Sequence, residues 1–157
     1  MQPTEPLKLS LSYSTIADMA LHLYYRINEQ NPKQRYKAVL CPLRGGFFLS
    51  NFLARRFDLP IEFIYLQSYQ GFESSEFQIH FQPTLEHGHR YLLCDDIFAT
   101  GRTTQRIQKL YPSIDFDAAY FYVHQQSILP FETTFYSRRI DQNVWIQFPW
   151  EDESIEF

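Results

Sequence analysis

The 157-residue sequence has no long apolar run and no run of basic residues. No stretch approaches the length of a membrane span, and the N-terminus lacks the apolar region of a signal peptide. We therefore expect a cytoplasmic protein without integral membrane association. The net charge of −4 and the lack of a basic patch disfavour nucleic acid as a partner.

Residues that bind transition metals are also sparse. The two cysteines, Cys41 and Cys94, lack the spacing of a zinc site, and the five histidines include no HxxxH pair. A disulfide between the cysteines would require neighbouring strands and an oxidising compartment, so two small buried thiols are the favoured interpretation.

What the sequence does contain is an alternation of apolar strand-like and helical segments. Strands are predicted at residues 36–41, 61–66, 91–94, 117–123, 133–136 and 143–147. Helices are predicted at residues 47–57 and 103–111, and a further helix begins with a capping box at Thr15 and Asp18 and stops at Asn31-Pro32. This order predicts an α/β fold, with residues 1–157 forming a single domain around a central, mainly parallel sheet flanked by helices.

Two segments lack such patterns. Residues 1–10 contain two prolines and no periodicity, which indicates a tail. Residues 70–86 belong to a long polar stretch, which indicates a flexible loop that closes over a ligand, with a hairpin arm at 76–81.

The most informative segment is 91–104, YLLCDDIFATGRTT. Its apolar start predicts a buried strand, at whose carboxyl end stand two carboxylates, Asp95 and Asp96. One such acid before a helix is usually a helix cap, but two adjacent acids followed by T-G-x-T-T are better explained as a site for ribose hydroxyls or hydrated Mg²⁺.

The loop after these acids has the features of a phosphate site. It opens a helix, whose first N–H groups and positive dipole end attract an anion. Gly101 permits close backbone approach, and Thr100 and Thr103 add hydroxyl donors. Acid pair, loop and helix together indicate a site for a phosphorylated sugar.

A second loop, Pro42-Leu43-Arg44-Gly45-Gly46, follows another predicted strand. Arg44 and the flexible peptides at Gly45 suit an anion, although a plain turn with a surface arginine would look the same. Both loops start where parallel strands end, which is where ligands bind in such sheets.

These residues resemble a known family. Residues 92–103, LLCDDIFATGRT, resemble the PRPP-binding motif of the type I phosphoribosyltransferases. Residues 42–46 are similar to the family's pyrophosphate loop, and residues 145–151, WIQFPWE, are similar to the base-binding segment of its xanthine-guanine members. Ser68-Tyr69 fits the same subfamily, so the resemblance covers about residues 11–151.

The resemblance implies a transferase that moves 5-phosphoribosyl from PRPP to a purine-like base and releases pyrophosphate. The residues it implies are catalytic Asp95 and Asp96, phosphate-binding Arg44, Gly45, Ala99, Thr100, Gly101, Arg102 and Thr103, base-binding Trp145 and Ile146, and Mg²⁺ ligands Asp96 and Glu151. It further implies a cis peptide near Leu43–Arg44, a base-binding hood over 125–157 and a homo-oligomer, either dimer or tetramer. Without the resemblance, a core or lid role for Trp145 would be the better interpretation.

The departures from the family pattern leave alternatives open. Ala99 stands where xanthine-guanine enzymes carry an acidic general base, and Arg102 replaces a glycine of the motif. The lysine expected near the end of strand 117–123, which reads a 6-oxo group, is absent; Tyr122 or His124 stands there. The alternatives are a non-catalytic PRPP- or nucleotide-binding regulatory module, and a transferase for a non-purine acceptor.

Overall fold

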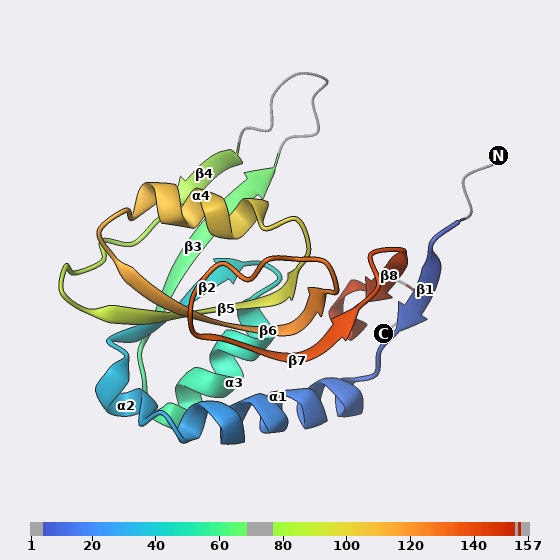
Figure 1. Cartoon of the computed structure of the whole chain (residues 1–157), viewed down its shortest axis with the longest axis horizontal. Coiled ribbons are helices and arrows are strands. Elements are labelled where there is room, and N and C mark those ends of the chain that lie inside the picture. The colour runs from blue at the N-terminus through green and yellow to red at the C-terminus, as the bar shows by residue number, and fades with distance from the viewer. Residues whose placement is uncertain (1–4, 69–76, 153, 155–157) are drawn as a thin grey trace.

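The computed structural model describes residues 5–68, 77–152 and 154. The elements along the chain (Figure 1) are β1 (Leu7–Ser10), α1 (Tyr13–Asn28), α2 (Pro32–Arg35), β2 (Ala38–Leu43), α3 (Phe47–Phe57), β3 (Ile61–Ser68), β4 (Phe77–Phe81), β5 (Arg90–Phe98), α4 (Arg102–Leu110), β6 (Asp115–His124), β7 (Thr134–Ile140), β8 (Val144–Gln147) and a 3₁₀ turn at Pro149–Glu151.

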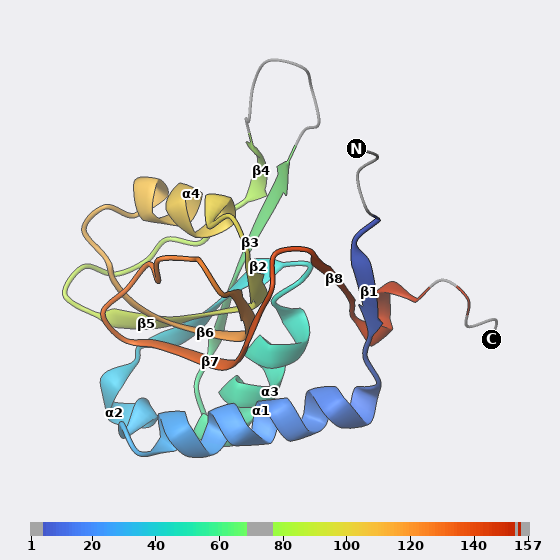
Figure 2. The same ribbon diagram turned by 45° about the vertical axis from the view of Figure 1, so that its right-hand side comes forward.

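The main sheet has the strand order β4-β3-β2-β5-β6-β7. Strands β3, β2, β5, β6 and β7 run parallel, and β4 pairs antiparallel with β3. Helices α1 and α3 cover one face of this sheet and α4 covers the other (Figures 1 and 2). The predicted α/β fold with a mainly parallel sheet is confirmed.

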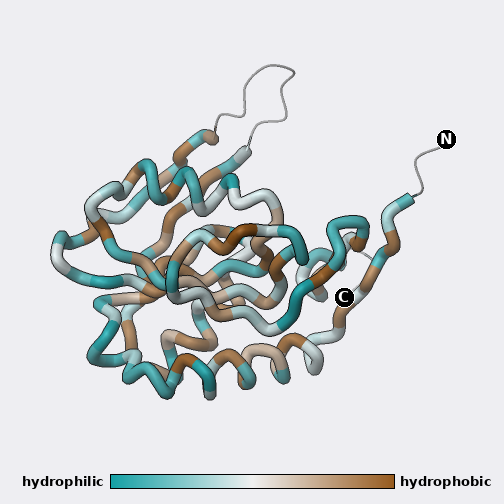
Figure 3. Tube along the Cα trace, viewed as in Figure 1, coloured by the Kyte–Doolittle hydropathy of each residue, from teal (hydrophilic) through white to brown (hydrophobic). Residues whose placement is uncertain are grey.

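The two faces of the sheet hold two separate apolar cores. Leu92 on β5 packs toward α1 and α3, whereas the next residue, Leu93, packs toward α4, as the two-residue period of a strand requires. Helix α4 is mostly hydrophilic along its trace (Figure 3), and only Thr104 and Ile107 of this helix are buried. Helix α4, which directly follows the candidate phosphate loop, therefore packs on the sheet through one narrow stripe of buried side chains.

The prediction of a tail over residues 1–10 was wrong for Leu7–Ser10. These residues form β1, which pairs in parallel with β8 at the other end of the sequence, from Leu7↔Val144 to Ser10↔Gln147. The side chains of β1 are exposed, so main-chain hydrogen bonds rather than burial hold it. Residues 1–4 lie outside the described residues.

Two further segments differ from prediction. β7 was placed in a hood over 125–157 but belongs to the main sheet beside β6, and the chain leaves that sheet only after Ile140. Within the predicted flexible loop 70–86, Phe77–Phe81 forms β4, as the predicted hairpin arm, while residues 70–76 lie outside the described residues.

The helix ends also differ. Ser12, not Thr15, caps α1: its Oγ accepts a hydrogen bond from the Thr15 N–H at 3.2 Å. The chain turns at Asn31, which has φ of 51°, and Pro32 then begins the short helix α2. Over 5–68, 77–152 and 154, we find no helix with both the length and the apolar content needed to cross a bilayer.

Candidate active site

The acid pair lies within β5 rather than after it, because this strand continues to Phe98. The Asp96 N–H donates to Oδ1 of Asp95 at 2.9 Å, and the Ile97 N–H donates to Oδ1 of Asp96 at 2.7 Å. These two bonds use Oδ1 of each carboxylate. Both side chains are partly buried at the carboxyl edge of the sheet.

This crowding makes both acids harder to ionise. Burial, reinforced by the charge of Asp96, raises the pKa of Asp95 well above its ordinary value. Burial and the charge of Glu151 raise the pKa of Asp96 to about 6. Buried carboxylates whose charged forms are destabilised in this way create a position where a bound cation would be favoured.

The candidate phosphate loop encloses a cavity of about 130 Å³, lined by Asp95, Ile97, Phe98, Ala99, Thr100, Gly101, Arg102, Thr103 and Thr104. Gly101 adopts φ of 77°, and a Cβ atom there would lie 2.8 Å from the Phe98 ring, so only glycine fits. Helix α4 begins at the next residue, and its first residues, Arg102 to Thr104, line the cavity.

Two bonds that local sequence patterns do not indicate hold this loop. The Ser127 hydroxyl donates to the Ala99 carbonyl at 3.0 Å, which ties the loop to the β6–β7 connection. The Thr104 and Tyr120 hydroxyls lie 2.9 Å apart in a buried pair that fixes the start of α4 on β6. Sequence reasoning missed Ser127 and Tyr120.

The second anion loop adjoins the acid pair because β2 and β5 are neighbours in the sheet. The Leu43–Arg44 peptide is cis, as the family resemblance implied. A Cβ atom on Gly45 would lie 2.6 Å from Oδ2 of Asp96, so the loop backbone rests directly on this carboxylate. Arg44 is exposed at the turn before α3.

Strand β5, which carries the acid pair, is held from one side by α3. The Ser50 hydroxyl of α3 donates to the Cys94 carbonyl at 3.2 Å, inside the core and one residue before the acid pair. Cys41 and Cys94 themselves are free, buried thiols. Ser50 had no sequence signal, because a serine inside a helix does not indicate a bond to a distant strand.

The C-terminal segment lies beyond the carboxyl edge of the main sheet (Figures 1 and 2). There Trp145 on β8 is 62% exposed, while Ile146 is buried. Glu151 accepts the Phe148 N–H at 3.1 Å through Oε2 and is close enough to Asp96 to affect its pKa. The charge of Glu151 thus acts on the acid pair, and most of the Trp145 side chain is open to solvent.

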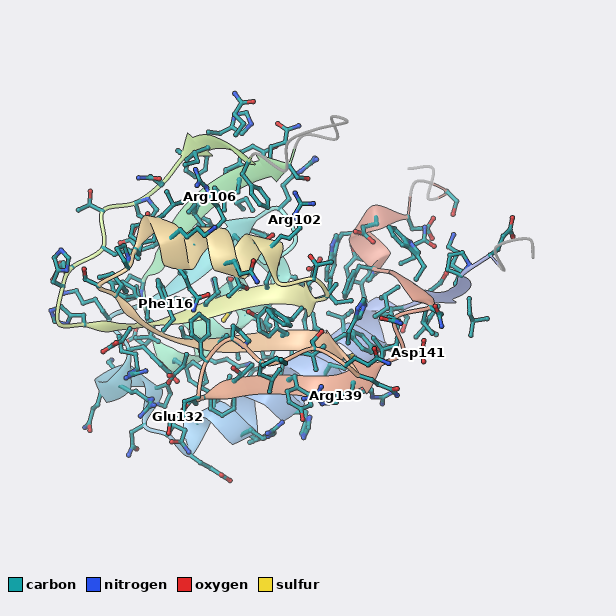
Figure 4. All side chains as sticks on the ribbon, turned by 45° about the horizontal axis from the view of Figure 1, so that its top comes forward. Arg102, Arg106, Phe116, Glu132, Arg139 and Asp141 are labelled. Carbon is teal, nitrogen blue, oxygen red and sulfur yellow. The ribbon has the colours of Figure 1, made fainter. Side chains whose placement is uncertain are left out.

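Around the end of β6, the neighbouring strand supplies positive charge. Tyr122 is paired in register with Arg138 of β7, and its ring packs edge-on against Phe148 at a centroid distance of 6.5 Å. Burial raises the pKa of Tyr122, and the charge of Arg138 partly offsets this. Arg139, labelled in Figure 4, instead donates to the carbonyls of His124 and Gln125.

Mg²⁺ is the metal that the family resemblance implied. The described residues contain no cluster of three or more His, Cys, Asp or Glu side chains. Asp96, which contacts the backbone of Gly45, and Glu151 nevertheless provide carboxylate oxygens. These suit an ion that keeps most of its waters and shares its remaining ligands with a substrate phosphate. The donor set therefore fits Mg²⁺ bound together with its substrate.

In the structure the acid pair of β5 lies between the loop at Gly45, which contacts Asp96, and the cavity of the loop that opens α4, which Asp95 helps to line. Residues 12–150 match the family described as "Phosphoribosyl transferase domain". The chain belongs to this family, as its sequence motifs suggested.

Individual relatives point the same way. The chain is 29% identical over 132 residues to a xanthine-guanine phosphoribosyltransferase of Nitratidesulfovibrio vulgaris, which covers 83% of this chain and 77% of that protein. Its fold is similar to that of the Pyrococcus horikoshii purine phosphoribosyltransferase, with a TM-score of 0.77, 19% identity and coverage of 96% and 97%. A Neisseria gonorrhoeae protein whose structure contains ppGpp has a TM-score of 0.76, 17% identity and coverage of 96% and 93%.

Proposed function

We propose that this protein transfers 5-phosphoribosyl from PRPP to a ring nitrogen of a purine base of the guanine, xanthine and hypoxanthine class. In this reaction the C1′–oxygen bond to pyrophosphate breaks, the C1′–nitrogen bond forms, and the base loses a proton. The observation that carries the proposal is the contact of Gly45 with Asp96, which puts an acid pair between two anion loops.

Each loop then has a distinct role. The N–H groups and hydroxyls of Ala99–Thr103 bind the 5′-phosphate at the start of α4. Arg44 and the backbone of Gly45 bind pyrophosphate. The carboxylates of Asp95 and Asp96 hold the ribose hydroxyls between them, directly or through the metal.

Catalysis in this arrangement depends on positioning and charge. C1′ becomes positive as pyrophosphate leaves, and the carboxylates below the ribose stabilise that charge. Asp96 and Glu151 would hold Mg²⁺, and the chemistry that this ion supplies is neutralisation of the leaving pyrophosphate. Because Ala99 cannot accept a proton, the proton of the base passes to water, to a phosphate oxygen or to another side chain.

The base would stack on the exposed ring of Trp145 while backbone groups of Ile146 bind its edge. Tyr122 provides a neutral hydrogen bond near the end of β6, and Arg138 is the cation closest to it by register. The 6-oxo group would thus be recognised less strongly than by a dedicated lysine.

A second candidate is a non-catalytic nucleotide-binding regulatory module. It is favoured by Ala99 at the general-base position and by the structural similarity to a protein that contains ppGpp. A transferase for a non-purine acceptor is the third candidate.

Measuring pyrophosphate release from PRPP and Mg²⁺ over a panel of bases separates these functions. Purine-dependent release supports the proposal, and release only with another base supports the third candidate.

The oligomeric state and the cellular location stay predictions. A dimer or tetramer is implied by the family resemblance, and light scattering of the purified chain tests it. Cytoplasmic location is tested by fractionation of the source cells.

A further inference from the structure

Arg102 occupies an unusual position for a cation. It is the first residue of α4, where the positive end of the helix dipole disfavours a positive side chain. It is exposed, and it lines the cavity of the candidate phosphate loop. A cation that lies in this position gains stability once an anion binds beside it.

The guanidinium of Arg102 has a partner from a distant strand. Its Cζ lies 5.6 Å from the ring centroid of Phe77, the first residue of β4. Among the described residues its guanidinium makes no hydrogen bond or ion pair, so this ring is its contact there. Figure 4 shows Arg102 at the loop end of α4, with Arg106 farther along the same helix.

Phe77 is itself held in place. It is partly buried and packs against the apolar core on the α4 side of the sheet, together with Ile79 of the same strand. β4 is fixed to β3 by antiparallel pairing, with Phe77 opposite Ser68. The ring therefore offers the guanidinium a firm surface next to the loop.

Stacking and phosphate binding do not compete for the same part of the guanidinium. A ring attracts the flat face of the cation, whereas its N–H donors lie in the plane and at the edge. A phosphate takes two of these in-plane donors. A stacked Arg102 can thus bind phosphate without leaving Phe77.

We propose that Phe77 is a positioning residue for the 5′-phosphate: it holds the guanidinium of Arg102 at the rim of the phosphate loop, where Arg102 binds a phosphate oxygen pair. The β3–β4 pair then belongs functionally to the phosphate site, and Arg102 replaces the lost glycine of the motif with a donor. This inference rests on the proposed function, because it needs a 5′-phosphate in the loop.

The test is a double-mutant cycle on GMP binding by calorimetry, with guanosine as the ligand that lacks phosphate. Arg102→Gly should weaken GMP binding by about tenfold or more, as expected for loss of a charged hydrogen bond. Phe77→Leu should weaken it by about threefold, the size of an exposed cation–π contact. Phe77→Leu should have no further effect in the Arg102→Gly protein. Phe77→Tyr, which keeps an aromatic ring beside Arg102, should bind GMP as tightly as wild type.

Two controls separate positioning from mere support of β4. Ile79→Val alters the same strand and the same core without touching Arg102, and should leave GMP affinity unchanged. Guanosine affinity should be equal in wild type, Phe77→Leu and Arg102→Gly, because the effect acts through the phosphate.

Each contrary result has its own meaning. If wild type binds GMP but the two substitutions act additively, or Phe77→Leu tightens binding, the positioning role is overturned while the proposed function stands. If wild type binds neither GMP nor PRPP with Mg²⁺, the proposed function fails and the positioning role fails with it.

Discussion

Gly45 of the second anion loop and Asp96 of β5 are in direct contact, since a Cβ atom on Gly45 would lie 2.6 Å from Oδ2 and 2.8 Å from Cγ of Asp96. The two residues come from neighbouring strands of one sheet. Their contact brings the acid pair under the point where a ligand bound by both loops would carry its sugar.

Gly45→Ala should reduce transferase activity by about tenfold or more, because the added methyl group must displace a catalytic carboxylate or the loop, and small displacements of reacting groups are costly. Initial rates with PRPP and guanine measure this. Gly88→Ala is the control: Gly88 differs from Gly45 in having a positive φ, 78°, but a Cβ atom there would meet nothing within 4 Å. It should lower stability slightly and keep full activity. Equal activities in both variants would contradict the account.

The double variant Asp95→Asn, Asp96→Asn should weaken PRPP binding in the presence of Mg²⁺ by about 2 kcal/mol or more, because charge-assisted hydrogen bonds are lost. Calorimetry gives the affinity. Asp115→Asn, at an exposed carboxylate at the opposite, amino end of β6, should leave it unchanged. An unchanged affinity in the double variant would remove the acid pair from the site.

The stability of the protein should depend on the ionisation of Asp96. Its pKa is about 6 in the folded protein against an ordinary 3.8, so the folded state holds this proton more tightly than the unfolded state. Asp96 therefore contributes to the free energy of unfolding while it is protonated. This contribution is fully present below pH 3.8 and is lost as the pH rises through about 6.

Asp96→Asn removes the charge and should therefore raise the free energy of unfolding at pH 7.5 by on the order of 2 kcal/mol, with much less effect near pH 4. Urea unfolding at the two pH values measures both. If Asp96→Asn raised the free energy of unfolding by the same amount at both pH values, the ionisation of Asp96 would not be the cause.

Ala99→Asp should raise turnover with guanine, hypoxanthine and xanthine, because it supplies a proton acceptor beside the ribose and α4. Steady-state kinetics over a base panel measures it.

Trp145→Ala should raise the KM for the base and leave the KM for PRPP unchanged, since the ring contacts only the base. Loss of PRPP affinity in Trp145→Ala would contradict the base-stacking role.

Much of this architecture could be predicted from local sequence. Residues 47–57 form a helix with the predicted bounds. Residues 38–41 of the predicted strand 36–41, and all of 91–94, lie in central strands, because these residues are buried on both faces. The TGRT loop was recognisable since Gly101 needs positive φ there.

The features that could not be predicted from the sequence depend on contacts between residues far apart in the chain. β1 exists because Leu7–Ser10 meets β8, and no local pattern announces a partner so far along the chain. The bonds from Ser127 to the Ala99 carbonyl and from Ser50 to the Cys94 carbonyl likewise join residues from separate elements. The contact of Phe77 with Arg102 also appears only once β4 is seen beside α4.

The most direct test of the central claim is to incubate the protein with PRPP, Mg²⁺ and guanine and to follow both pyrophosphate and nucleotide by mass spectrometry. The account predicts equal amounts of pyrophosphate and GMP from wild type, and neither above background from Asp95→Asn, Asp96→Asn. Tight binding of PRPP by wild type without either product, for every base of the panel, would contradict it and favour the regulatory module.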